Sequence, residues 1–191
     1  MTAAGYITRE TTIQTTTSRI DIIRDAAPFS LTFYRQFARD GFEQPNALDV
    51  VRSLRQAPAF YLQTKGLSAD VVRSLESAAR AVVPMFTGST FTVATFETGT
   101  ELRPRQNGWI VVDTHDDSSE SANCGQAYLG APDGSIWINT SQTCYRNTDM
   151  LLSTFAHEIG HALGFSHVDN PRFLMYRDWA EGILLLGPGG P

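Results

Sequence analysis

The stretch "AHEIGHALGFSHVDNPRFLMY", residues 156–176, holds three of the four histidines of the chain within eleven positions. Its first half belongs to a longer segment, "NTDMLLSTFAHEIGHALG", whose apolar residues recur every four positions: Leu151, Phe155, Ile159 and Leu163. This period predicts the longest helix of the protein, over residues 147–164. Gly164 is the residue best able to end that helix in a left-handed conformation.

The three histidines and a glutamate have the spacing of a metal site. His157 and His161 stand at i and i+4, about 40° apart around the helix axis, so their rings point the same way. Glu158 flanks that face, and Gly164 lets the chain turn so that His167 returns as a third ligand. Histidines at this spacing also occur as ordinary surface or core residues, and H-E-x-x-H alone recurs by chance. The complete pattern H-E-x-x-H-x-x-G-x-x-H favours a zinc site.

The motif is followed by "LMY", with Met175 eight residues past His167. This combination resembles the signature of the metzincin metallopeptidases, and its Met-Tyr pair is most similar to the matrixin, or matrix-metalloproteinase-like, branch. The motifs cover residues 134–179. The resemblance implies an α/β fold with a twisted, mostly parallel sheet, one antiparallel edge strand, a zinc-binding helix and a methionine turn at Met175. On its own, Met175 is only a buried methionine.

The resemblance also implies an activity, that of a metalloendopeptidase acting on extended polypeptides. Three neutral imidazoles leave Zn²⁺ one open position at which it activates water. Glu158 is the expected general base. Two alternatives stay open: a latent or non-catalytic zinc-containing binding module, and a zinc hydrolase of small amides.

Substrate contacts are expected from two segments. The resemblance assigns "GSIWIN" to the antiparallel edge strand, whose main chain would pair with an extended peptide. Its residues are Gly134, Ser135, Ile136, Trp137, Ile138 and Asn139. The alternative is an edge strand without that role. Tyr176 and Trp179 are expected to line the pocket for the side chain after the scissile bond, with the small Ser153 leaving it deep. Matrixins usually carry proline and tyrosine where Arg177 and Trp179 stand here.

Upstream of the motif, the pattern predicts strands at 59–64, 89–97 and 108–114 and helices at 30–41, 46–56 and 68–86. The expected N-caps are Ser30, Asn46, Ser68 and, for the long helix, Thr148 or Asp149. Residues 8–20 are rich in threonine and predict an extended leader. We therefore expect residues 1–57 to be a leader, pro-segment or helical extension, and residues 58–191 to be the catalytic domain.

The composition of the chain limits which binding partners and which cellular compartment are expected. The net charge of −5 disfavours nucleic acid or an anionic membrane as the main partner, and no apolar run approaches a membrane span. We expect a monomer that binds a polypeptide substrate. Cys124 and Cys144 fit one disulfide of an exported protein or a pair of reduced thiols, and their position around the expected edge strand favours the disulfide. The opening "MTAAGYITRE" has no signal-peptide pattern, yet a secreted, extracellular or periplasmic protein is expected.

Two acidic features suggest further roles. The run "DTHDDSSE" could hold calcium through Asp113, Asp116, Asp117 and Glu120, but a solvated acidic loop is the commoner explanation for such a run. Asp40, in "ARDGF", is a candidate inhibitory ligand to the zinc, against the alternative of a solvated aspartate at a helix end.

Overall fold

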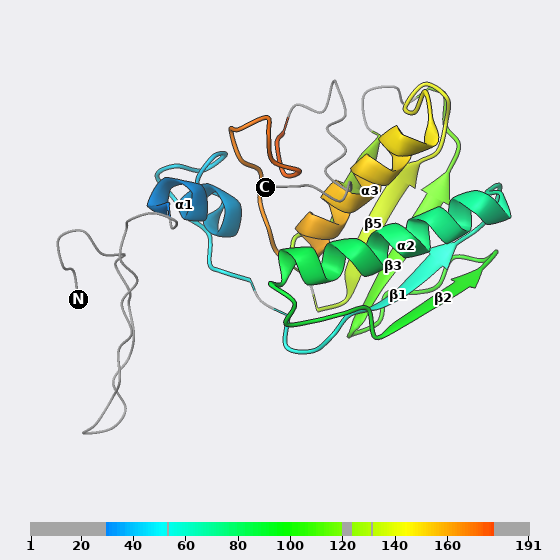
Figure 1. Cartoon of the computed structure of the whole chain (residues 1–191), viewed down its shortest axis with the longest axis horizontal. Helices are drawn as coiled ribbons and strands as arrows, with labels where there is room; N and C mark the ends of the chain where they lie inside the picture. Colours follow the sequence, from blue (N-terminus) through cyan, green and yellow to red (C-terminus); the bar gives the residue numbers. More distant parts are fainter. Residues whose placement is uncertain (1–29, 53, 120–123, 131, 178–191) are drawn as a thin grey trace.

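The computed structural model of the protein describes residues 30–52, 54–119, 124–130 and 132–177. Its elements are α1 (Leu31–Arg39), β1 (Ala59–Gln63), α2 (Ala69–Phe86), β2 (Thr95–Gly99), β3 (Trp109–His115), β4 (Gly125–Ala127), β5 (Gly134–Asn139) and α3 (Thr148–Ala162). The strands form one sheet in the order β2-β1-β3-β5-β4. All neighbouring pairs are parallel except β4 and β5. The predicted α/β fold, with a mostly parallel sheet and one antiparallel edge strand, is confirmed (Figure 1).

The core lies between one face of the sheet and the helices α2 and α3, which run side by side over it (Figure 1). Side chains alternate along a strand, so residues two apart share a face. In register across the sheet, this face carries Phe60, Leu62, Ile110, Val112, Ile136 and Ile138. The helices contribute Leu75, Ala79, Val82, Phe155 and Ile159 to the same core. The zinc-motif helix is therefore fixed against the centre of the sheet.

The position predicted for residues 134–139 is wrong. β5 pairs with β3 on one side and with β4 on the other, so it lies inside the sheet and is not the edge strand. Its alternating pattern has the same appearance in either position, since both leave one face of the strand buried. The antiparallel edge strand is the three-residue β4, which the disulfide between Cys124 and Cys144 ties to the loop before α3. The disulfide itself was predicted and is confirmed.

The helix predicted over residues 46–56 does not form in the described part of that segment. Asp49 instead bonds to the end of α1: its N–H donates to the Arg39 carbonyl (3.0 Å), and its own carbonyl accepts from Arg39 Nε (2.9 Å). The Asp49 carboxylate accepts the Val50 N–H, a local bond that competes with helix formation. Val50 and Val51 remain 67% and 52% exposed, so the expected apolar face had nothing to pack against.

The other boundaries lie near the predicted ones, with one exception. The strand predicted over residues 89–97 begins only at Thr95. Before it, the Thr87 hydroxyl accepts the Phe91 N–H (3.1 Å) and Ser89 has a positive φ of 61°, which makes this segment a turn. Ser30 and Ser68 are the N-caps of α1 and α2, as predicted. None of the helices in the described residues has the length and apolarity that a membrane span requires.

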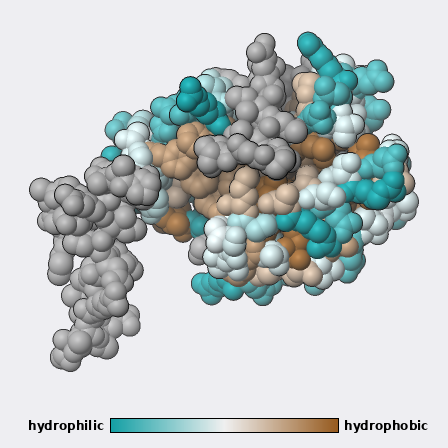
Figure 2. Space-filling view, in the orientation of Figure 1, coloured by the Kyte–Doolittle hydropathy of each residue, from teal (hydrophilic) through white to brown (hydrophobic). Residues whose placement is uncertain are grey.

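The helix α1 packs on the segment that follows α3 and not on the sheet. Phe37 stacks on Phe165 with ring centroids 4.2 Å apart, and Phe33 lies 4.7 Å from Phe173. The Ser166 N–H also donates to the Phe37 carbonyl (2.8 Å). Figure 2 shows hydrophobic side chains gathered where α1 meets this segment. Although the division of the chain at residue 57 stays a prediction, residues 30–52 contact the loop that carries His167.

Candidate metal centre

The helix α3 presents His157 and His161 on one side. Asn147 caps its N-terminus, accepting the Met150 N–H (3.0 Å) from an extended conformation, so the prediction of Thr148 or Asp149 as the cap is wrong. The two rings lie one turn apart, with centroids 4.7 Å apart and planes nearly perpendicular.

The chain reverses after α3 and returns His167 to the same point. Gly164 has a φ of +102°, the conformation expected of it from the sequence. The Nε2 atom of His167 then lies 3.2 Å from that of His157 and 3.1 Å from that of His161. Nitrogens bound tetrahedrally to one Zn²⁺ at the usual bond length would be about 3.3 Å apart. The structure thus brings together all three predicted ligands, with one ring nitrogen of each within 4.8 Å of the other two.

Each ring has a hydrogen-bond acceptor behind it. The Nδ1 of His157 contacts the Leu174 carbonyl (2.7 Å), and that of His161 contacts the Phe165 carbonyl (2.7 Å). For His167 the acceptor is a side chain, Oε1 of Glu43 (3.3 Å). With the proton on Nδ1 each ring points an unprotonated Nε2 at the centre. In this tautomer three nitrogen lone pairs converge and no N–H group lies among them. This is the arrangement of ligand atoms that binds a cation.

Burial keeps two of the imidazoles neutral. Burial, and after it the neighbouring His161, lower the pKa of His157 to about 3. The pKa of His161 is lowered to about 4, again by burial first and then by His167. Neutral imidazole is the form that binds a metal, so the folded protein does not have to lose protons at these two residues before a metal binds near neutral pH.

Glu158 is buried next to the first ligand, at 5% exposure. Its Oε2 has no hydrogen-bond partner, and burial raises the pKa of the carboxyl to about 8. A buried carboxylate oxygen without a partner is costly, and sites of this kind are usually functional. Its Oε1 lies close to β4: a Cβ on Gly125 would be 2.8 Å away. The orphaned oxygen and the three converging nitrogens together fit a metal centre with a carboxylate held ready beside it.

Met175 lies beneath the ligand helix. It is 1% exposed, and a Cβ on Gly160, between the two histidines of α3, would collide with its sulfur. The Val168 N–H donates to the Met175 carbonyl (2.9 Å), which ties the turn at Met175 to the residue after His167. Met175 is therefore buried, as expected from the residue alone, and its place in a methionine turn stays a prediction of the resemblance.

An apolar cavity of about 260 Å³ opens beside these residues. It is lined by Phe33, Phe37, Met85, Phe86, Ser153, Ala156, Phe173, Leu174 and Met175. Ser153 is the one predicted pocket residue among them. Tyr176 does not line it, and Trp179 lies outside the described residues. The contribution of α1 was not expected from the sequence.

The remaining predicted sites are not assembled in the described residues. Within them, the three histidines are the only group of His, Cys, Asp and Glu placed to hold a metal. Asp113, Asp116 and Asp117 form no such group, and Glu120 lies outside the described part of the chain. Asp40 caps α1, and its carboxylate accepts from Gln44 (2.9 Å).

Two residues of this centre gave no signal in the sequence. Glu43 is 124 positions from His167 and belongs to no periodic segment. Gly125 is part of a strand too short for its alternation to be recognised. A motif can identify ligands, but not the distant residues that the fold places against them.

The chain is similar to metalloproteinase-II from Bacteroides fragilis, with 20% identity and a TM-score of 0.45 over 65% of this chain and 47% of the other. It is also similar to high choriolytic enzyme 1, a hatching enzyme zinc-protease from the medaka fish Oryzias latipes, with 23% identity and a TM-score of 0.34 over 58% and 44%. The chain thus spans less than half the length of either structure. No match was found among curated proteins.

One family profile, matrixin of the M10 peptidases, matches residues 84–182. The match covers just over half of the chain and includes the three histidines, Glu158 and Met175. The chain belongs to the matrixin family of peptidases.

Proposed function

We propose that the protein is a zinc-dependent endopeptidase that hydrolyses peptide bonds in extended polypeptides. The observation that carries this proposal is the convergence of the three imidazole Nε2 atoms beside the buried, partnerless carboxyl oxygen of Glu158. A purely structural zinc site has four protein ligands, whereas a hydrolytic one keeps a position open and a base nearby.

The roles divide among the residues of the centre. His157, His161 and His167 would hold the metal through Nε2. Zinc bound there would polarise the scissile carbonyl and lower the pKa of water. Oε2 of Glu158 would accept the proton of the attacking water and then deliver it to the departing amine. The position of Glu158 beside the three histidines suits a group that must take a proton from the attacking water and return it to the amine.

The outer side of the edge strand β4 favours the proposal that the substrate is an extended peptide. One side of β4 pairs with β5, and the other pairs with no strand in the described residues. Gly125 of this strand lies against Glu158, so a peptide added along β4 would pass the base. Residues 134–139, predicted as the pairing strand, would then support β4 from inside the sheet. The apolar cavity next to Met175 favours an apolar side chain near the scissile bond.

The test is cleavage of an unfolded protein such as casein by the zinc-loaded full chain and by Glu158→Ala. We expect the wild type alone to cut casein, a chelator to stop it and added zinc to restore it. Glu76→Ala, which removes a surface glutamate paired with Arg80, is the matched control and should cut like the wild type. The proposal fails if both the wild type and Glu158→Ala leave casein intact with one zinc bound per chain, a result that would favour a binding role.

A further inference from the structure

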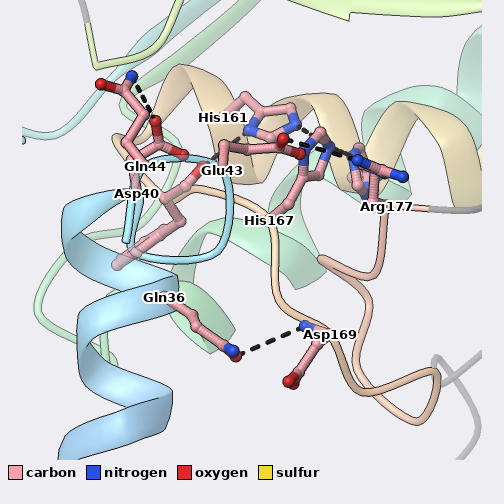
Figure 3. A network of polar contacts seen from close by, with 10 residues as sticks. Gln36, Asp40, Glu43, Gln44, His161, His167, Asp169 and Arg177 are labelled. Carbon is pink, nitrogen blue, oxygen red and sulfur yellow. Dashed lines mark hydrogen bonds and ion pairs between the residues drawn. The ribbon is translucent and has the colours of Figure 1, made fainter. Parts of the chain in front are cut away.

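The three ligand rings are not held in the same way. Main-chain carbonyls accept from the Nδ1 of His157 and of His161, and both acceptors lie in the family-matched part of the chain. The acceptor for His167 is the carboxylate of Glu43, in the turn after α1 and outside residues 84–182. The third ligand thus depends on a side chain from the N-terminal part of the protein (Figure 3).

The Glu43 carboxylate is placed between two partners. Its Oε1 faces Nδ1 of His167 at 3.3 Å, and its Oε2 lies 3.6 Å from a guanidinium nitrogen of Arg177, just past the methionine turn (Figure 3). Arg177 also lies over the Phe42 ring, 5.5 Å from its centroid. The carboxylate therefore links the turn after α1 to the loops on both sides of Met175.

The turn that carries Glu43 is itself anchored near the metal centre. Its N-terminal side is fixed by the Gly41 N–H, which donates to the Arg35 carbonyl (2.8 Å). α1 is joined to the loop of His167 by the bond from the Ser166 N–H to the Phe37 carbonyl and by aromatic stacking. A second contact runs from the Asp169 N–H to the Gln36 side chain (3.5 Å). These contacts present Glu43 to His167 on a supported piece of backbone.

We propose that Glu43 is a positioning residue of the metal centre, and that it couples metal affinity to the segment 30–52. By accepting the Nδ1 proton, its carboxylate fixes the orientation of the His167 ring and makes Nε2 a more basic ligand. This inference rests on the proposed metal site. It identifies residues 30–52 as part of the working centre and not as a segment to be removed.

Mutation of an ordinary surface ion pair and mutation of a positioning residue should have different effects on stability and on metal binding. Glu43 is 37% exposed, and exposed ion pairs contribute little to folding stability. Removing a carboxylate behind a metal-bound histidine, by contrast, typically weakens metal binding by about 10- to 100-fold. Glu43→Ala should therefore weaken metal binding while leaving the unfolding of the metal-free protein almost unchanged.

The experiment is a competition titration of Zn²⁺ between the full chain and a chromophoric chelator. We expect Glu43→Ala to bind zinc about 10- to 100-fold more weakly than the wild type. Glu43→Gln should fall between them, because its amide oxygen still accepts the Nδ1 proton but carries no charge. Gln44→Ala is the matched control: it removes the bond to Asp40 in the same turn without touching His167, and should bind zinc like the wild type.

A second readout follows the ligand field. In the Co²⁺-substituted protein, Glu43→Ala should shift the visible absorption bands, and Glu43→Gln should restore them toward the wild-type positions. Zinc affinity within twofold of the wild type in Glu43→Ala, or an equal loss in Gln44→Ala, overturns the proposal while leaving the endopeptidase function standing. A wild-type chain that binds no zinc would overturn both.

Discussion

The disulfide between Cys124 and Cys144 should stabilise the fold by about 3 kcal/mol. The two cysteines are 20 positions apart, and the loop-entropy relation gives about 3 kcal/mol for a loop of this length. The bridge also fixes the start of β4, where the Tyr145 hydroxyl donates to the Cys124 carbonyl (2.5 Å). Its loss should therefore loosen the edge strand that lies against Glu158.

The perturbation is the double replacement Cys124→Ala and Cys144→Ala, unfolded in urea in the metal-free form. Linear extrapolation should give a free energy of unfolding about 3 kcal/mol below that of the oxidised wild type. The wild type reduced with dithiothreitol is the matched control, because it loses the bridge while keeping both side chains in place. It should lose nearly the same stability.

A loss below about 1 kcal/mol in both samples would refute this reasoning, since the loop-entropy relation allows no such small value for this separation. A large loss in the alanine variant with none in the reduced wild type would assign the effect to packing, because Cys144 is 7% exposed and belongs to the core cluster. In either case the account of β4 as a strand held by its disulfide would be wrong.

Two glycine replacements test the backbone of the metal centre. Gly160→Ala should lower the free energy of unfolding by about 1 kcal/mol, because the cost of overpacking against Met175 and Phe86 exceeds the gain in helix propensity. The same variant should bind zinc more weakly, because the added methyl group displaces Met175. A more stable variant in urea, with unchanged zinc affinity, would contradict the close packing. Gly164→Ala should cost about 2 kcal/mol, because its φ of +102° is strained for any L side chain and Arg52 lies within 3.2 Å of the added Cβ. Wild-type stability in a thermal melt would show that the turn does not need glycine.

The zinc ligands could be predicted from the sequence because nearly everything that places them is local. His157 and His161 follow from the helical period, and His167 from the glycine turn that comes next. The spacing of side chains along a helix depends on backbone geometry alone. The i, i+4 separation of two histidines therefore places both rings on one side without knowledge of the rest of the fold. The mostly parallel α/β sheet was implied by the resemblance to the metzincins, and the order of strand and helix patterns from about residue 58 onward agrees with it.

Sheet order could not be read in the same way. "GSIWIN" alternates between core and partly exposed residues whether it lies at the edge or one place inside. The position of β5 inside the sheet is determined by β4, whose three residues pair with Ile136, Trp137 and Ile138. A strand this short carries too little alternation to be recognised, and the edge strand that the resemblance implied was therefore placed at residues 134–139.

The failed helix over residues 46–56 has a related cause. Its apolar residues have helical spacing, but a helix needs a surface on which to bury that face. The fold supplies none for Val50 and Val51, and Asp49 bonds to Arg39 at the end of α1 instead. Tertiary contacts therefore override the local preference of this segment for a helix.

The measurement that tests the central claim most directly compares the wild type with Glu158→Gln in one preparation, recording bound zinc and the turnover of a quenched fluorescent peptide. The amide keeps the shape of the side chain but cannot accept the proton of water. We predict one zinc per chain in both proteins and a turnover at least about 100-fold lower in the variant. Equal turnover at equal zinc content would contradict the role of Glu158 as the base and, with it, the mechanism proposed for this protein.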